Sequence, residues 1–138
     1  MNPDVWNLFH DGTISNLSGD IPGDVWVLIE IGYLRAMFPG HGNGFSVLLR
    51  ACSTLEFEEY DKQPISEFTQ IVEREPEILA CEPVGPTLEI TCTLGTIRIV
   101  YAEEQVFLED GTLISPEELA AASARYWEEW KRSWQSPP

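Results

Sequence analysis

The chain has 138 residues, of which 43% are hydrophobic, and its 23 acidic and 8 basic side chains give a formal net charge of −15. This length suits one folded domain over residues 1–138, and this hydrophobic content excludes a disordered chain. Because nucleic acids and anionic membranes attract proteins mainly through Lys and Arg, we expect neither a nucleic-acid nor a membrane partner.

The first predicted element is a hairpin around Asp11-Gly12. Both central residues of a type I′ turn need a positive φ, and the Asp-Gly pair accepts this conformation. We therefore expect strands near residues 5–10 and 13–18, joined by this turn.

The next predicted strand is the apolar run at residues 25–31, which has the composition of a central strand covered on both faces. Further along the chain, Leu55 and Phe57 alternate with glutamates, and β-branched residues dominate residues 96–101. The links between such runs are too short for crossover helices, so neighbouring strands should be antiparallel. We expect seven or eight short strands in total.

Two short helices are predicted between the strands. Residues 33–38 have apolar side chains at helical spacing, enough for one or two turns before Pro39. A middle helix is expected after Ser66, which we assign as its N-cap, and it should end before Pro76.

The strongest local signal lies near the C-terminal end of the chain. Ser115 is followed by proline and, at the third helical position, by Glu118, which together form a capping box at the start of a helix. The predicted helix covers residues 116–134, and its aromatic stripe should pack on the sheet. Three tryptophans do not fit one narrow stripe, so at least one should be partly exposed. The expected fold is an α+β domain with a largely antiparallel sheet, one short middle helix and this long C-terminal helix.

The cysteines indicate a reducing compartment. Cys52, Cys81 and Cys92 are odd in number and lack Cys-x-x-Cys spacing, which argues against a disulfide framework and a zinc site. The start of the sequence has neither the basic nor the apolar region of a signal peptide, and no apolar run reaches the length of a membrane span. We therefore expect a cytoplasmic protein with reduced, buried thiols.

The two histidines carry little catalytic signal. His10 and His41 have no partners at metal-binding spacing, and the glycine-rich loop around His41 lacks the residues of a phosphate-binding loop. His10 and Asp11 are a candidate acid-base pair, but neighbours on a strand point to opposite faces. We expect no catalytic residue, no metal and no cofactor, and an enzyme is the less favoured class.

The densest acidic cluster begins on the predicted strand near residue 55 and continues just past its end. Residues 51–100 contain ten acidic and three basic side chains, a net charge of −7. A solvated strand face explains such a cluster, and so does a surface that attracts a basic partner. The candidate partner-binding residues are Glu56, Glu58, Glu59 and Asp61.

Several segments together suggest a resemblance that covers nearly the whole chain. These segments are residues 9–12, 19–24, 33–35, 115–119 and 126–130. With them the chain resembles a family of small acidic bacterial proteins without an assigned function. It is also similar in type to the immunity proteins of bacterial toxin systems, which are short, acidic, cytoplasmic α+β domains. Neither resemblance assigns a role to any residue.

Two hypotheses follow for the function. The first is a non-enzymatic interaction protein, an immunity-type inhibitor that uses an acidic face against a basic protein partner. The alternative is a small-molecule-binding protein or enzyme whose pocket lies between the sheet and the C-terminal helix and includes His10 and Asp11. A homo-oligomer formed through the C-terminal helix is compatible with both.

Overall fold

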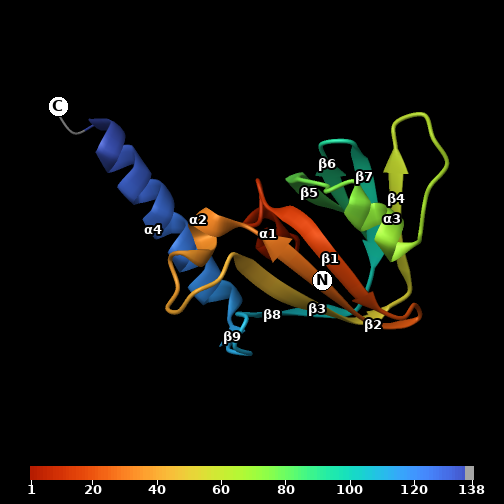
Figure 1. Ribbon diagram of the computed structural model, residues 1–138, viewed down its shortest axis with the longest axis horizontal. Coiled ribbons are helices and arrows are strands. Elements are labelled where there is room, and N and C mark those ends of the chain that lie inside the picture. The colour runs from red at the N-terminus through yellow and green to blue at the C-terminus, as the bar shows by residue number, and fades with distance from the viewer. Residues whose placement is uncertain (136–138) are drawn as a thin grey trace.

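The computed structural model describes residues 1–135 and shows an α+β fold built on two antiparallel sheets (Figure 1). The first sheet has five strands in the order β1-β2-β3-β8-β9, and the second has four in the order β4-β7-β6-β5. The strands of the first sheet are β1 (Thr13–Gly19), β2 (Gly23–Glu30), β3 (Gly44–Cys52), β8 (Glu103–Phe107) and β9 (Leu113–Ile114). Those of the second are β4 (Thr54–Glu59), β5 (Ile78–Val84), β6 (Thr87–Cys92) and β7 (Gly95–Val100).

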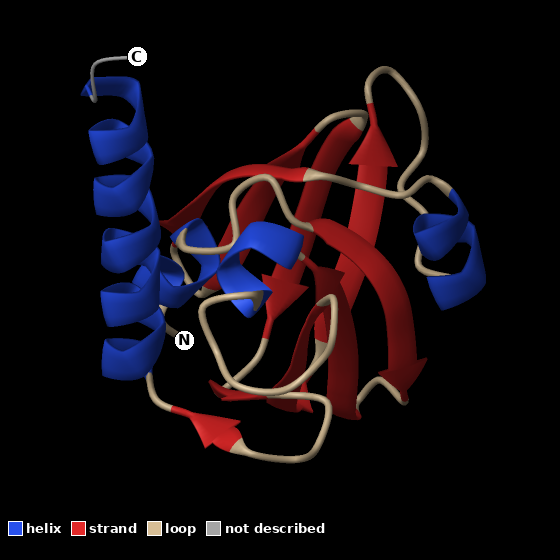
Figure 2. Ribbon diagram, turned by 60° about the vertical axis from the view of Figure 1, so that its left-hand side comes forward, coloured by secondary structure: helices blue, strands red, loops and turns tan. Residues whose placement is uncertain are grey.

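Within residues 1–135, four helices flank the sheets. They are α1 (Pro3–Asn7), α2 (Gly32–Arg35), α3 (Phe68–Glu73) and α4 (Pro116–Gln135). Helix α4 contacts α1 and α2, which lie between it and the strands, and α3 packs on β1 at the opposite side of the molecule (Figure 2). The predicted middle helix and long C-terminal helix are therefore present, and α2 occupies the predicted helical turns before Pro39.

The two sheets are joined because two paired strands each continue from one sheet into the other. β3 leads through Ser53 into β4, while β7 leads through Tyr101 and Ala102 into β8. At the bend, the Ser53 amide donates to the Val100 carbonyl (2.9 Å) and the Ala102 amide donates to the Arg50 carbonyl (2.9 Å). Pairing is therefore maintained through the corner, and the sheets face each other across one core.

The core lies between the inner faces of the sheets. In β4 and β7 alternate residues point inward, so β4 buries Leu55 and Phe57 while β7 buries Ile97 and Ile99. The same alternation leaves the polar residues of these strands on the outer face of the second sheet. This arrangement determines where the acidic residues of β4 lie.

The predicted strand near residues 5–10 is wrong. Residues 3–7 form helix α1, in which the side chain of Asn2 accepts a hydrogen bond from the Asp4 amide (3.1 Å) and Pro3 takes the first helical position. Val5 and Trp6 are buried by this helix. Asp11 has the expected positive φ, of 72°, but Gly12 does not, so the predicted type I′ turn is absent and this segment connects α1 to β1. The cap at Asn2 and the burial of Val5 and Trp6 thus favour a helix here over the hairpin that Asp11-Gly12 suggested.

Strand β2 is an interior strand of its sheet, between β1 and β3, but it is not covered on both faces. Val25, Val27 and Ile29 are buried, whereas Trp26 is 40% exposed and Leu28 is only partly buried. The outer side of β2 carries an aromatic pair instead of a covering helix, with the rings of Trp26 and Phe107 5.5 Å apart. An apolar run is therefore compatible with a strand that has one partly solvated face.

Helix α4 begins with the predicted capping box. The Glu118 amide donates to Ser115 Oγ (3.1 Å), and the Ser115 amide donates to Glu118 Oε1 (3.2 Å). Leu119 and Ala122 are part of the core. Two aromatic residues further along the helix are exposed to solvent, Trp130 at 44% and Trp134 at 75%. Among the described residues, no helix combines the length and apolar character needed to cross a membrane.

Candidate functional site

The most regular charged surface is the outer face of the second sheet. We call it the acidic sheet face and define it by Glu56, Glu58, Glu82, Glu89 and Arg98. Strand pairing sets the positions, because Arg98 lies opposite Glu56 on one side and opposite Glu89 on the other. The face thus carries four carboxylates from three strands and one guanidinium, with Glu82 one strand beyond Glu89.

Arg98 only partly neutralises this face. Its Nη1 lies 3.4 Å from Glu58 Oε2, and its Nε lies 3.9 Å from Glu89 Oε2. Glu82 lies directly opposite Glu89 in the β5–β6 pair, an arrangement of like charges that costs stability. The excess negative charge is therefore held on rigid strands, where it is available to a positively charged partner.

Two of the four predicted partner-binding residues do not belong to this face. Glu59 ends β4 and forms ion pairs with Arg74 and with Lys62, the latter at 3.0 Å. Hydrogen bonds from Arg74 and then Lys62 hold the pKa of the Glu59 carboxyl below its usual value. Asp61 lies in the following turn with a φ of 62°. Glu56 and Glu58 are brought together with Glu82 and Glu89, two residues that the sequence analysis did not select.

His10 and Asp11 lie in the turn after α1, so the expected opposite orientation on a strand does not apply. His10 Nε2 is 3.9 Å from Asp11 Oδ2, while His10 Nδ1 is 3.0 Å from the Asn7 carbonyl oxygen. The imidazole stacks on Trp127 of α4, with ring centroids 5.8 Å apart and planes 15° apart. Its surroundings are those of a packing contact between the turn and α4.

The ionisable side chain in contact with His10 on the α2 side is Tyr33, a hydrogen-bond donor and not a catalytic base. Tyr33 donates its hydroxyl hydrogen to the His10 carbonyl oxygen (3.1 Å), and its ring lies 4.5 Å from that of Tyr126. Burial, followed by the negative charge of Asp11, raises the pKa of Tyr33 to about 12. The hydroxyl therefore stays protonated near neutral pH and serves as a hydrogen-bond donor.

The cysteine thiols are buried and unpaired. Burial raises the pKa of Cys81 and of Cys92 to about 12 and raises that of Cys52 as well. A protonated thiol is a poor nucleophile and a poor metal ligand, so these groups are suited to packing. Within residues 1–135, no three His, Cys, Asp or Glu side chains are arranged to hold a metal ion.

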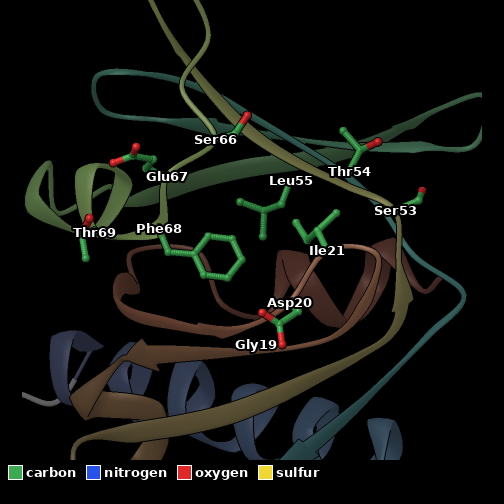
Figure 3. Close-up of a pocket in the computed structure, with 10 residues that line it drawn as sticks. All are labelled: Gly19, Asp20, Ile21, Ser53, Thr54, Leu55, Ser66, Glu67, Phe68 and Thr69. Atoms are coloured by element: carbon green, nitrogen blue, oxygen red, sulfur yellow. The ribbon is translucent and has the colours of Figure 1, made fainter.

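A second candidate site is a cavity of about 670 Å³. It opens between the β1–β2 turn, the start of β4 and the start of α3 (Figure 3). His10 and Asp11 do not line it. The N-cap of α3 is Glu67 and not the expected Ser66, and both residues lie in the segment that forms one wall of the cavity.

No family model, curated protein or solved structure matches this chain. The candidate functional sites are thus defined by geometry alone. They are the acidic sheet face and the 670 Å³ cavity.

Proposed function

We propose that this protein is a non-enzymatic interaction protein that binds a basic protein partner through the acidic sheet face. The observation that carries the proposal is the placement of Glu56, Glu58, Glu82 and Glu89 on one sheet face that holds a single arginine, Arg98. Complementary charge accelerates association and discriminates against acidic competitors. A face made of paired strands changes shape little on binding, which lowers the entropic cost of association.

The partner is a protein with a basic surface, and the action is that of an immunity-type inhibitor that covers this surface. The net charge of −15 supports long-range attraction of such a partner. The three unpaired, buried cysteines support a place of action in the cytoplasm, where thiols stay reduced. The chemistry around His10 and the cysteines supports a binding role over a catalytic one.

The test is affinity capture from the native host at low and at high salt, with three forms of the protein as bait. The face variant carries Glu56→Gln, Glu58→Gln, Glu82→Gln and Glu89→Gln. We expect wild type to capture a basic protein at low salt and the face variant to lose it. Capture should also fall as salt rises, because screening weakens the attraction between exposed charges.

A matched control separates this face from net charge. It carries Glu30→Gln, Glu103→Gln, Glu117→Gln and Glu129→Gln, so its charge changes by the same four units at exposed sites elsewhere. The control should capture the same protein as wild type. Equal capture by the face variant, or equal loss in both variants, contradicts the proposed binding face. For an inhibitor, the captured protein must also lose its own activity in the complex.

A further inference from the structure

The cavity beside α3 has the size and construction of a small-molecule site. Its volume of about 670 Å³ lies within the range of roughly 300–1,000 Å³ typical of ligand pockets. Three separate chain segments line it, residues 19–21, 53–55 and 66–69. These segments meet where the first sheet passes into the second, on the side of the molecule away from α4 (Figures 1 and 2).

The centre of the cavity is apolar. Ile21, Leu55 and Phe68 point toward one another across it (Figure 3). Leu55 is buried, whereas Ile21 and Phe68 are partly exposed within the opening and pack against the core from its edge. A ligand with an aromatic or branched aliphatic body would remove this exposed apolar surface from water.

The margin of the cavity is negative. Asp20 lies beside the apolar centre and Glu67 lies next to Phe68 (Figure 3). Serine and threonine hydroxyls complete the rim, and no Lys, Arg or His is among the lining residues. Within residues 1–135, the carboxylates of Asp20 and Glu67 take part in no hydrogen bond or ion pair. Their charge is therefore unbalanced beside an apolar surface.

The wall that carries Asp20 is fixed to the corner between the sheets. Asp24 accepts hydrogen bonds from the Ala51 amide (3.1 Å) and from Arg50 Nη1 (2.9 Å). These bonds, that from Ala51 first, hold the pKa of the Asp24 carboxyl below its usual value, so the tie persists near neutral pH. The carboxylate of Asp24, in β2, is thus used in these structural hydrogen bonds, while that of Asp20, in the turn before β2, is not.

The opposite wall is fixed to the second sheet. Ile65 and Phe57 exchange two backbone hydrogen bonds, of 2.9 and 2.8 Å, directly before the lining segment begins. At its other end, α3 buries Ile71 completely in the core. Both walls are therefore held in place without a ligand, which lowers the cost of binding one.

We propose that this cavity binds a small organic cation, an amine with an aromatic or branched aliphatic body. The body rests on Ile21, Leu55 and Phe68, and the ammonium group faces Asp20, with Glu67 as a second carboxylate at the rim. This site differs from the acidic sheet face in location and ligand, so it does not depend on the proposed function. It also differs from the pocket beside α4 that the sequence analysis expected.

Isothermal titration calorimetry with three matched probes tests the proposal. The probes are 2-phenylethylamine, 2-phenylethanol and 3-phenylpropionate, which share a phenyl body and carry a positive, neutral or negative head. We expect the amine to bind about tenfold or more tightly than the alcohol, because a charge-assisted hydrogen bond is stronger than a neutral one. We expect no binding of the carboxylate.

Variants distinguish the cavity from general attraction of cations to an acidic protein. The double variant with Asp20→Asn and Glu67→Gln should weaken amine binding about tenfold or more, because it removes the charge-assisted hydrogen bonds to the ammonium group. The control Glu30→Gln with Glu103→Gln makes the same change in net charge and should leave binding unchanged. Equal binding of amine and alcohol, no binding of the amine, or equal effects of the two double variants would overturn the proposal. Circular dichroism and thermal unfolding verify that each variant is folded.

Discussion

At the scale of single residues, a buried hydrogen-bonded chain connects the N-terminal helix to the corner between the sheets. Trp6 Nε1 donates to the Tyr101 hydroxyl oxygen (2.7 Å), and that hydroxyl donates to Glu104 Oε1 (2.8 Å). The same carboxylate oxygen accepts the Asn2 amide (2.6 Å). Burial, and then the charge of Glu104, raises the pKa of Tyr101, so its hydroxyl keeps the proton that it donates. Each buried polar group thereby has a partner.

We expect Tyr101→Phe to lower the free energy of unfolding by about 1–3 kcal/mol, because it leaves the buried Trp6 indole N–H without an acceptor. Urea unfolding followed by tryptophan fluorescence measures the change. Tyr60→Phe is the matched control, since Tyr60 is 65% exposed and should change stability by less than about 0.5 kcal/mol. Equal losses in the two variants would show that the buried hydrogen bond contributes nothing specific.

At the scale of elements, α4 is attached to the body by its first half. Leu119 and Ala122 reach the core, while Tyr126 and Trp127 are partly buried against α2 and the turn at His10. Beyond them the ring contacts run along the helix itself, with Trp130 and Trp134 5.6 Å apart. Self-association through this exposed half stays a prediction. The stability of α4 should depend on its capped, packed start.

Ser115→Ala should cost about 0.5–2 kcal/mol, because it removes the acceptor for the Glu118 amide at the start of α4. Ser133→Ala provides a control with the same chemical change near the exposed end of the helix, where the hydroxyl donates to the Trp130 carbonyl. That substitution should have an effect below about 0.5 kcal/mol. Urea unfolding of both variants measures the difference, and an equal cost at the two sites would contradict the importance of the cap.

Elements with local signals were predictable from the sequence. The capping box at Ser115 locates α4, and the alternation around Leu55 locates β4 together with its solvated face. The strand predicted before Asp11 depended on the Asp-Gly turn, whereas the structure has a helix in this segment that is capped by Asn2. The helix prevailed because it buries Trp6 and lets Asn7 bond the edge strand β5 at Cys81 (3.0 and 3.1 Å).

The candidate sites depend on pairings between distant segments, which no local pattern encodes. Glu82 and Glu89 join Glu56 only because β7 pairs with both β4 and β6. The cavity likewise needs segments near residues 20, 54 and 67 to meet. Composition did predict the sign of both sites, since acidic residues outnumber basic ones by 23 to 8. Geometry was needed to show which carboxylates remain without a countercharge.

At the scale of the whole molecule, the charge of −15 is confined to a smaller volume in the folded chain than in the unfolded one. Ion pairs such as that between Arg50 and Asp24, at 2.9 Å, offset part of the repulsion. Exposed pairs of this kind contribute little, however, and 8 basic side chains do not balance 23 acidic ones. Net repulsion should therefore outweigh local attraction in the folded state.

We expect the midpoint of urea unfolding to rise as NaCl increases, because the Debye length falls from about 10 Å at 0.1 M to about 3 Å at 1 M salt. Screening then weakens the repulsion more in the compact folded state than in the expanded unfolded state. Urea is suitable because it is uncharged. The variant with Glu30→Gln, Glu103→Gln, Glu117→Gln and Glu129→Gln should be less sensitive to salt, since these sites form no described ion pair. A midpoint that falls with salt would show instead that pairs such as Arg50 with Asp24 dominate the electrostatics of folding.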